Sequence, residues 1–210
     1  MPALIRPKLK MGKKDLLGSA PDQCSTALLL IDVINDLQFP EADELLRFAV
    51  PMAKRLQALK HESRRAGVPS IYINDNFGRW QSNFSALAKH CLSSRGREVA
   101  QMLRPRKDDY FVLKPKHSAF YSTTLDTLLR YLGAKRLIIT GMAANICVWF
   151  TANDAYMRDF RLWVPKDCVC SNTTRENDFA LQQMEHVLKA DVRPFNSLRR
   201  HRFLTTISRK

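Results

Sequence analysis

The 210-residue sequence has no apolar run of the ~18–20 residues that a membrane-spanning helix needs. It also lacks the continuous apolar stretch of a secretory signal, because basic residues interrupt the apolar ones throughout residues 1–14. These absences argue against a membrane or exported protein. We therefore expect a cytoplasmic protein with one packed core, for which a chain of this length is sufficient.

Cysteine is sparse, odd in number and scattered, which argues against a disulfide framework. The Cys168/Cys170 pair has no second Cys or His pair at zinc-finger spacing, so it predicts a buried strand end rather than a metal site. We expect five free thiols, at Cys24, Cys91, Cys147, Cys168 and Cys170.

Acidic residues are fewer than basic ones, and the formal net charge is +14. Residues 1–22 carry a net +3 and residues 193–210 a net +6, so nine of the fourteen charges lie on the two ends of the chain. This distribution predicts basic, solvated extensions and makes nucleic acid a poor candidate partner. Binding of another anionic partner, or contact with a neighbouring subunit, stays open as an alternative.

Apolar runs of strand length alternate with longer segments of helical period, which is typical of βαβ units and a parallel sheet. We expect a single three-layer α/β/α domain at 23–193 with a mainly parallel, doubly wound sheet of about six strands, between basic extensions at 1–22 and 194–210. The expected strands are Thr26–Ile31, 68–74, 110–113, 136–140, 161–164 and 191–192. The expected helices are 42–66 (kinked or broken at Pro51), 84–103 (interrupted near 93–96), 124–131, 145–159 and 173–188.

Three polar side chains lie beyond the carboxyl ends of expected strands, where sites form in open α/β sheets. Asp32 directly follows the first strand, Lys114 directly follows the third, and Cys147 lies just past the fourth. Alone, each also fits an ordinary role, as a cap, a solvated cation or an inert buried thiol. Together they supply a base, an electrostatic stabiliser and a nucleophile.

The segment before Cys147 predicts a tight strand-to-helix turn, because Gly141, Ala143 and Ala144 are all small. If Asn145 is the N-cap, Cys147 falls in the first helical turn. Unpaired N–H groups and the helix dipole there favour a thiolate, and the same N–H groups suit an oxyanion.

These segments resemble the isochorismatase-like superfamily of cysteine hydrolases, which includes nicotinamidases and N-carbamoylsarcosine amidase. T-A-L-L-L-I-D resembles the family's first strand and V-L-K-P-K-H-S-A-F-Y its Lys segment. L-I-I-T-G-M-A-A-N-I-C-V, continued by T-A-N-D-A-Y-M-R-D-F, resembles its nucleophile loop and helix. The similarity runs over about 26–172 and is most specific over 110–167.

The resemblance implies a cysteine amidohydrolase in which Asp32 deprotonates Cys147 and Lys114 orients Asp32. The thiolate attacks an amide or carbamoyl carbon of a small molecule to give a thioester. The oxyanion is held by the N–H groups of Cys147 and Ala143, next to a cis peptide between Met142 and Ala143. The resemblance also implies a homo-oligomer, either a dimer or a tetramer.

The sequence departs from common family patterns at Ile34, Leu37 and Ala144, so the substrate of a better-known member cannot be assumed. After the second strand the D-x-H metal motif of nicotinamidases is missing, which argues against zinc and nicotinamide. We therefore expect no cofactor and no metal. Position alone predicts a substrate-binding rim of Asn76, Phe77, Trp80, His117, Phe120, Tyr121 and Trp149.

Two other functions remain open at this stage. The same fold supports ether or ester hydrolysis of a small metabolite, although Cys147 argues against the isochorismate reaction, whose enzymes lack this Cys. A non-catalytic scaffold that binds an anionic partner through the basic ends is the second alternative. The intact Asp32, Lys114 and Cys147 set argues against the scaffold.

Overall fold

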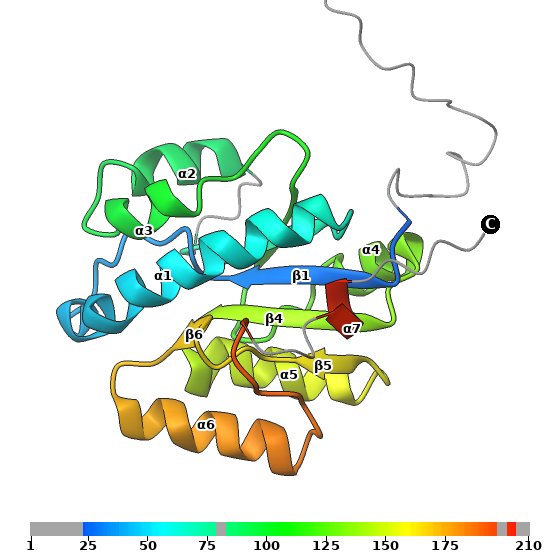
Figure 1. Ribbon diagram of the computed structural model, residues 1–210. Coiled ribbons are helices and arrows are strands. Elements are labelled where there is room, and N and C mark those ends of the chain that lie inside the picture. Colours follow the sequence, from blue (N-terminus) through cyan, green and yellow to red (C-terminus); the bar gives the residue numbers. More distant parts are fainter. Residues whose placement is uncertain (1–22, 79–82, 197–200, 205–210) are drawn as a thin grey trace, which may run out of the picture.

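The computed structural model describes residues 23–78, 83–196 and 201–204. A parallel sheet lies between two helical layers (Figure 1), and its strand order is β3-β2-β1-β4-β5, with β6 paired to β4 beside this path. This is the three-layer α/β/α architecture expected from the sequence. The strands are β1 (Thr26–Ile31), β2 (Ser70–Asp75), β3 (Tyr110–Lys114), β4 (Arg136–Met142), β5 (Arg161–Trp163) and β6 (Val169–Cys170).

The two central strands, β1 and β4, consist mainly of buried apolar residues because helices cover both faces of the sheet. Alternate residues of β1 face opposite layers, with Leu28 and Leu30 in one core cluster and Leu29 and Ile31 in the other. The β1–β4 register pairs Ile31 with Gly141, so the chain leaves both strands at the same edge of the sheet.

Helices α1, α2 and α3 pack on one face of the sheet, and α5 and α6 on the other (Figure 1). Helix α4 contributes to the same core cluster as α5 and α6. Residue Thr173 begins α6 with a capping box, since its side chain accepts from the Glu176 N–H and Glu176 accepts from the Thr173 N–H. Gly133 ends α4 in the left-handed conformation at φ 73°. The helical bounds are α1 (Ala42–Arg65), α2 (Phe84–Cys91), α3 (Arg97–Met102), α4 (Leu125–Leu132), the π-helical turn η2 (Ala144–Val148), α5 (Trp149–Tyr156), α6 (Thr174–His186) and α7 (His201–Leu204).

Two local predictions are wrong, and of the two alternatives at Pro51 the break is excluded. Helix α1 continues through Pro51, whose ring lies on the exposed side while Ala49 and Met52 remain buried in the core. The segment 191–192 makes only an isolated bridge from Asp191 to Trp163, and the sixth strand is β6 instead. The expected helix 145–159 begins as η2 at Ala144, so Asn145 is not its N-cap.

The C-terminal extension is not wholly solvated in the part that the structure describes. Phe195 is buried, and the Phe203 ring lies 5.6 Å from the Trp163 ring. The Trp163 indole N–H also donates to the Arg193 carbonyl at 2.9 Å. Phe195 and, in α7, Phe203 and Leu204 therefore pack on the domain beyond the expected boundary at 193. The N-terminal extension 1–22 lies outside the described residues.

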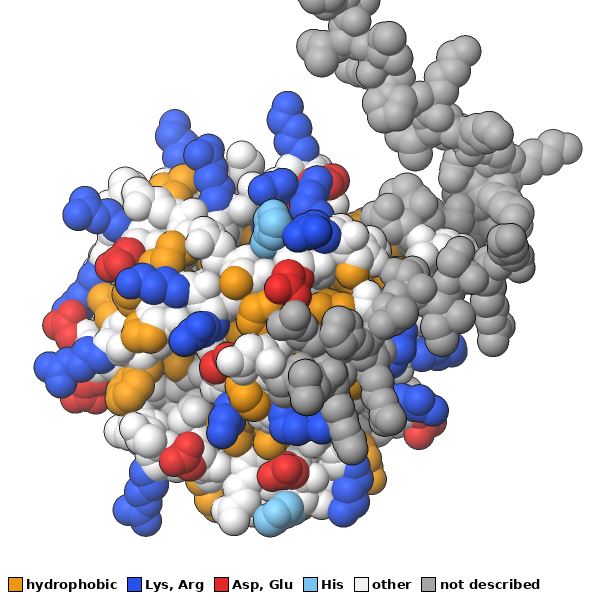
Figure 2. Space-filling view, viewed as in Figure 1, with side chains coloured by type: hydrophobic (Ala, Val, Ile, Leu, Met, Phe, Trp, Pro, Cys, Tyr) orange, Lys and Arg blue, Asp and Glu red, His pale blue; other side chains and the backbone are white. Residues whose placement is uncertain are grey.

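Basic side chains are spread over the face seen in Figure 2, with acidic and apolar ones between them. Within the part of the chain that the structure describes, no helix is long and apolar enough to cross a membrane.

Candidate active site

Asp32, Lys114 and Cys147 meet at the edge of the sheet where β1, β3 and β4 end. The Lys114 Nζ atom donates to Asp32 Oδ2 at 2.9 Å and to Cys147 Sγ at 3.5 Å. The Asp32 carboxylate also lies close enough to the Cys147 thiol to influence its pKa. Three strand ends far apart in sequence thus place a carboxylate and a thiol around one ammonium group.

Asp32 occupies the left-handed backbone region at φ 52°, which is uncommon outside glycine. Its N–H donates to the Ile73 carbonyl at 2.8 Å, and its Oδ1 accepts from the Asp75 N–H at 2.9 Å. Burial raises the pKa of Asp32, more strongly than the nearby Lys114 cation and the hydrogen bonds lower it. A carboxylate with a raised pKa is better suited to accept a proton than an exposed one.

The Lys114 side chain is fully buried at the end of β3. Burial lowers its pKa, but the facing Asp32 and Cys147, together with Asp75, raise it more, so the net shift is upward and Lys114 stays cationic. Asp75 Oδ2 lies 3.9 Å from Lys114 Nζ. A buried cation is therefore balanced by two carboxylates, as its desolvation requires.

Asp75 was missed in the sequence-based list of site residues. It is the last residue of β2, and its N–H and carboxylate contact Asp32 and Lys114 respectively. The sequence carried a signal for it, because Asp75 stands at a strand end just as Asp32 does.

Gly141 allows β4 to approach β1 closely beside the site. Its φ is 110°, and a Cβ atom there would lie 2.0 Å from the Ile31 carbonyl oxygen. The Gly141 N–H also donates to the Cys168 carbonyl at 3.0 Å. The peptide bond between Met142 and Ala143 is cis, as the resemblance implied. The chain then enters η2, which carries Cys147.

The surroundings of Cys147 do not favour a thiolate at rest, in contrast to the expectation from a helix N-terminus. Burial and the Asp32 carboxylate raise the pKa of Cys147 to about 12, and Lys114 offsets only part of this. Asn145 does not cap the turn, and its side-chain oxygen instead accepts from the Ser171 hydroxyl at 2.9 Å. Cys147 is therefore a thiol that requires a base.

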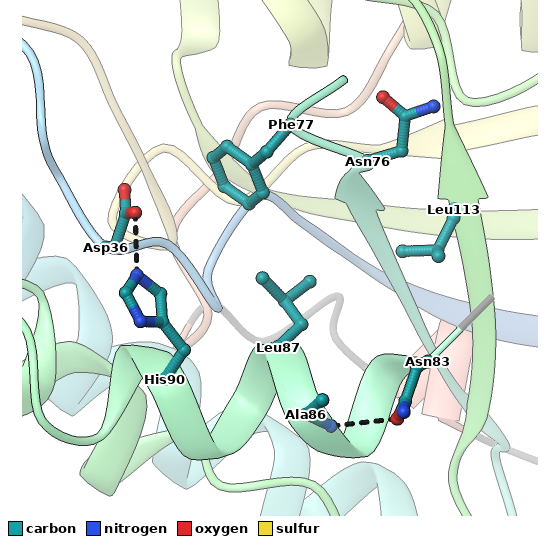
Figure 3. Close-up of a pocket in the computed structure, with 8 residues that line it drawn as sticks. All are labelled: Asp36, Asn76, Phe77, Asn83, Ala86, Leu87, His90 and Leu113. Atoms are coloured by element: carbon teal, nitrogen blue, oxygen red, sulfur yellow. Dashed lines mark hydrogen bonds and ion pairs between the residues drawn. The ribbon is translucent and has the colours of Figure 1, made fainter. Parts of the chain in front are cut away.

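The residues predicted to bind substrate do not lie together in the structure. His117 Nδ1 lies 3.9 Å from Cys147 Sγ. Asn76 and Phe77 line a cavity of about 100 Å³ together with Asp36, His90 and residues of α2 (Figure 3). The Phe77 ring points into this cavity and the Asn76 side chain points away from its centre.

The other members of the predicted rim do not form one wall. Phe120 is buried in the core, where its ring lies 6.2 Å from Phe160, so the structure does not support a place for it in the pocket. Tyr121 is exposed, and Trp149 stacks on Phe179 with 6.2 Å between ring centres. Trp80 lies outside the described residues.

Among the described residues, no group of three or more His, Cys, Asp or Glu side chains is arranged to hold a metal ion. All five cysteines are free thiols, and Cys168 and Cys170 are buried at β6, as expected.

The sequence profile of the Isochorismatase domain matches residues 26–192. The uncharacterized isochorismatase family protein YaaI of Bacillus subtilis is 44% identical over 166 residues, which cover 79% of this chain and 92% of that protein. The ureidoacrylate amidohydrolase RutB of Methylorubrum extorquens is 43% identical over 62 residues, 30% of this chain and 25% of that enzyme. The crystal structure of N-carbamoylsarcosine amidase from Thermoplasma acidophilum superposes with a TM-score of 0.66 at 26% identity, covering 83% of this chain and 99% of that one.

The family model and the fold define a hydrolase class, and its solved and curated neighbours include proteins named as an amidase and an amidohydrolase. The chain belongs to the isochorismatase family.

Proposed function

We propose that this protein is a metal-independent cysteine amidohydrolase that cleaves a C–N bond of a small amide or carbamoyl compound. The observation that carries the proposal is the contact of one buried cation, Lys114, with both the Asp32 carboxylate and the Cys147 thiol, at 2.9 Å and 3.5 Å. The amide-cleaving activities named for RutB and for N-carbamoylsarcosine amidase support the same class of substrate.

In the proposed first step, Asp32 accepts the Cys147 proton. The raised pKa of Asp32 brings it closer to that of the thiol, and the neighbouring Lys114 cation stabilises the thiolate that forms. The thiolate then attacks the carbonyl carbon of the substrate. The backbone N–H groups of Ala143 and Cys147 are the proposed oxyanion donors. Collapse of this intermediate expels ammonia or an amine, and water hydrolyses the thioester.

Substrate selection is proposed to depend on residues around the thiol. Of the predicted rim, His117 is the described residue that contacts Cys147, and Asn76 and Phe77 follow β2 directly after Asp75. The flat rings of His117 and Phe77 would suit a small, partly planar substrate.

A homo-oligomer and a cytoplasmic location remain part of the proposal. The exposed apolar side chains of Ile146, Phe150 and Phe179 favour self-association, because a second copy that covered them would remove apolar surface from water. The proposed hydrolase domain spans 23–193, and Phe195, Phe203 and Leu204 of the C-terminal extension pack on it.

The test is ammonia release from a panel of small amides, carbamoyl amino acids and ureides, with Cys147→Ala and Cys168→Ala compared to the parent. Cys168→Ala is the matched control because Cys168 is also a buried free thiol, and its Sγ atom contacts Asp167. Ammonia release that is lost in Cys147→Ala and retained in Cys168→Ala supports the amidohydrolase. Turnover of ester or ether substrates without any release of ammonia would instead support the alternative hydrolase.

A further inference from the structure

His117 is the described side chain that reaches Cys147 from the solvent side. Its Nδ1 atom lies 3.9 Å from Cys147 Sγ, and the His117 side chain is exposed. Lys114 contacts the same sulfur from the interior at 3.5 Å and pairs there with Asp32, and the side chains of Lys114 and Asp32 are 0% and 8% exposed. The thiol is therefore placed between a buried ion pair and an open imidazole.

The loop after β3 holds His117 in this position. The next residue, Ser118, donates its hydroxyl to the Asp154 carboxylate, and the Ala119 N–H donates to the Thr151 hydroxyl at 3.0 Å. The imidazole itself lies against the Phe150 ring, with 5.5 Å between ring centres. These contacts connect the loop to α5, which directly follows the turn that carries Cys147.

The interior groups are poorly placed for proton exchange with water or with a leaving amine. Asp32 is fixed by Lys114 at 2.9 Å and by the Asp75 N–H at 2.9 Å, and it is buried. A substrate enters from solvent, on the side of His117. Its nitrogen would leave, and the hydrolytic water would arrive, on that same side. An imidazole is the side chain best suited to give and take a proton near neutral pH.

We propose that His117 is a fourth catalytic residue, the proton carrier for the leaving nitrogen and for the hydrolytic water. The proposal rests on the cysteine mechanism given above. Asp32 takes the thiol proton, and the S–C bond forms as the carbonyl electron pair moves to oxygen. Protonated His117 then gives its proton to the nitrogen, the C–N bond breaks and the amine leaves.

The second half of the cycle restores both groups. Neutral His117 accepts a proton from the water that attacks the thioester carbon, and is protonated again. Collapse of the second intermediate breaks the S–C bond, and the Cys147 sulfur recovers its proton from Asp32. One amide and one water become one carboxylic acid and one amine, and no other reactant is consumed.

The test separates the two halves with 4-nitrophenyl acetate, because 4-nitrophenolate leaves without needing a proton whereas water attack still needs a base. The parent, His117→Gln and the surface control His61→Gln are mixed with the ester. The burst of nitrophenolate reports acylation and the following steady rate reports deacylation. Mass spectrometry measures the acetyl group on Cys147, and Cys147→Ala shows the background.

We expect His117→Gln to slow the steady rate about 100-fold, the scale of a lost general base, and far more than the burst. Acetylated Cys147 then accumulates in this variant and not in His61→Gln. Equal slowing of the two phases, or an unchanged steady rate, would overturn the role of His117 while leaving Cys147 as nucleophile. No Cys147-dependent acetylation in the parent would overturn the proposed function, and the role of His117 with it.

Discussion

Cys147 is kept in its protonated form by the residues that are proposed to activate it. Burial and the negative Asp32 carboxylate raise the pKa of the thiol to about 12, and the Lys114 cation lowers it by less. The group is thus unlike a cysteine at an open helix N-terminus, where the pKa falls. The thiolate is expected to form only when the substrate is present to receive it.

This protonation state has a consequence for chemical labelling. Because alkylation requires the thiolate, the rate of Cys147 modification by iodoacetamide should rise about tenfold for each pH unit below the thiol pKa. We expect this rise to continue from about pH 7 to about pH 10 without a plateau, measured by mass spectrometry of the Cys147 peptide. A plateau near neutral pH would show a thiolate at rest and would contradict the raised pKa.

Replacement of Asp32 separates thiol acidity from catalysis. Asp32→Asn removes the negative charge that raises the pKa of Cys147 and leaves the Lys114 cation facing the sulfur. Alkylation at pH 8 should therefore become faster, while amide turnover falls about 10²–10⁴-fold through loss of the base. Asp36→Asn, at a carboxylate on the neighbouring cavity, is the control. Slower alkylation in Asp32→Asn would contradict the assigned electrostatics.

At the residue level, the sequence predicts that Asp32, Lys114 and Cys147 lie together, because each lies beyond the end of an expected strand, and the structure brings them together. It could not give the direction of the pKa shift of Cys147, since that depends on burial and on the distance to Asp32. The sequence placed His117 on the predicted rim but could not show its contact with Cys147, because that contact depends on how the loop after β3 is held against α5.

The elements β1 and β4 determine where the site residues lie, and their close approach depends on Gly141. A Cβ atom at this position would meet the Ile31 carbonyl oxygen at 2.0 Å, one residue before Asp32. Gly141→Ala should lower the free energy of unfolding by about 3 kcal/mol, from steric displacement together with the unfavourable positive φ. Denaturant unfolding measures this change.

The matched control for Gly141→Ala is Gly133→Ala. Gly133 also has positive φ, but no atom lies within 4 Å of its added Cβ, so only the backbone preference of about 1 kcal/mol should be lost. Equal losses in the two variants would show that the approach of β4 to β1 is not tight.

The type of most elements followed from the periodicity of the sequence. The errors occurred where an element is too short to show a period or where tertiary contacts determine its conformation. Strand β6 has only Val169 and Cys170, too few for a pattern, and pairing with β4 defines it. The π-helical turn after Ala143 depends on how the chain leaves β4, which local propensity does not encode. Pro51 is tolerated because burial on the other side of α1 outweighs one lost hydrogen bond.

On the scale of the whole molecule, aromatic residues of the C-terminal extension, Phe195 and Phe203, pack on the core of the domain. Phe203 packs on Trp163, whose indole also bonds to the Arg193 carbonyl. The charge distribution predicts a solvated extension, because basic residues outnumber its two aromatic residues, Phe195 and Phe203.

We expect Phe203→Ala to lower the free energy of unfolding by about 1–2 kcal/mol, less than a fully buried Phe because the ring is half-buried. Met157→Ala, at a side chain that is 70% exposed, should change it by less than about 0.5 kcal/mol. Thermal unfolding of the two variants compares them directly. No difference between them would mean that α7 does not contribute to the stability of the domain.

The most direct test of a cysteine amidohydrolase is the mass of the protein during turnover of an amide that releases ammonia. After an acid quench, we expect an added acyl group on the Cys147 peptide of the parent. The Cys147→Ala variant should carry no acyl group and should release no ammonia. Ammonia release by Cys147→Ala at the parent rate, with no acyl group on Cys147 in the parent, would contradict Cys147 as the nucleophile.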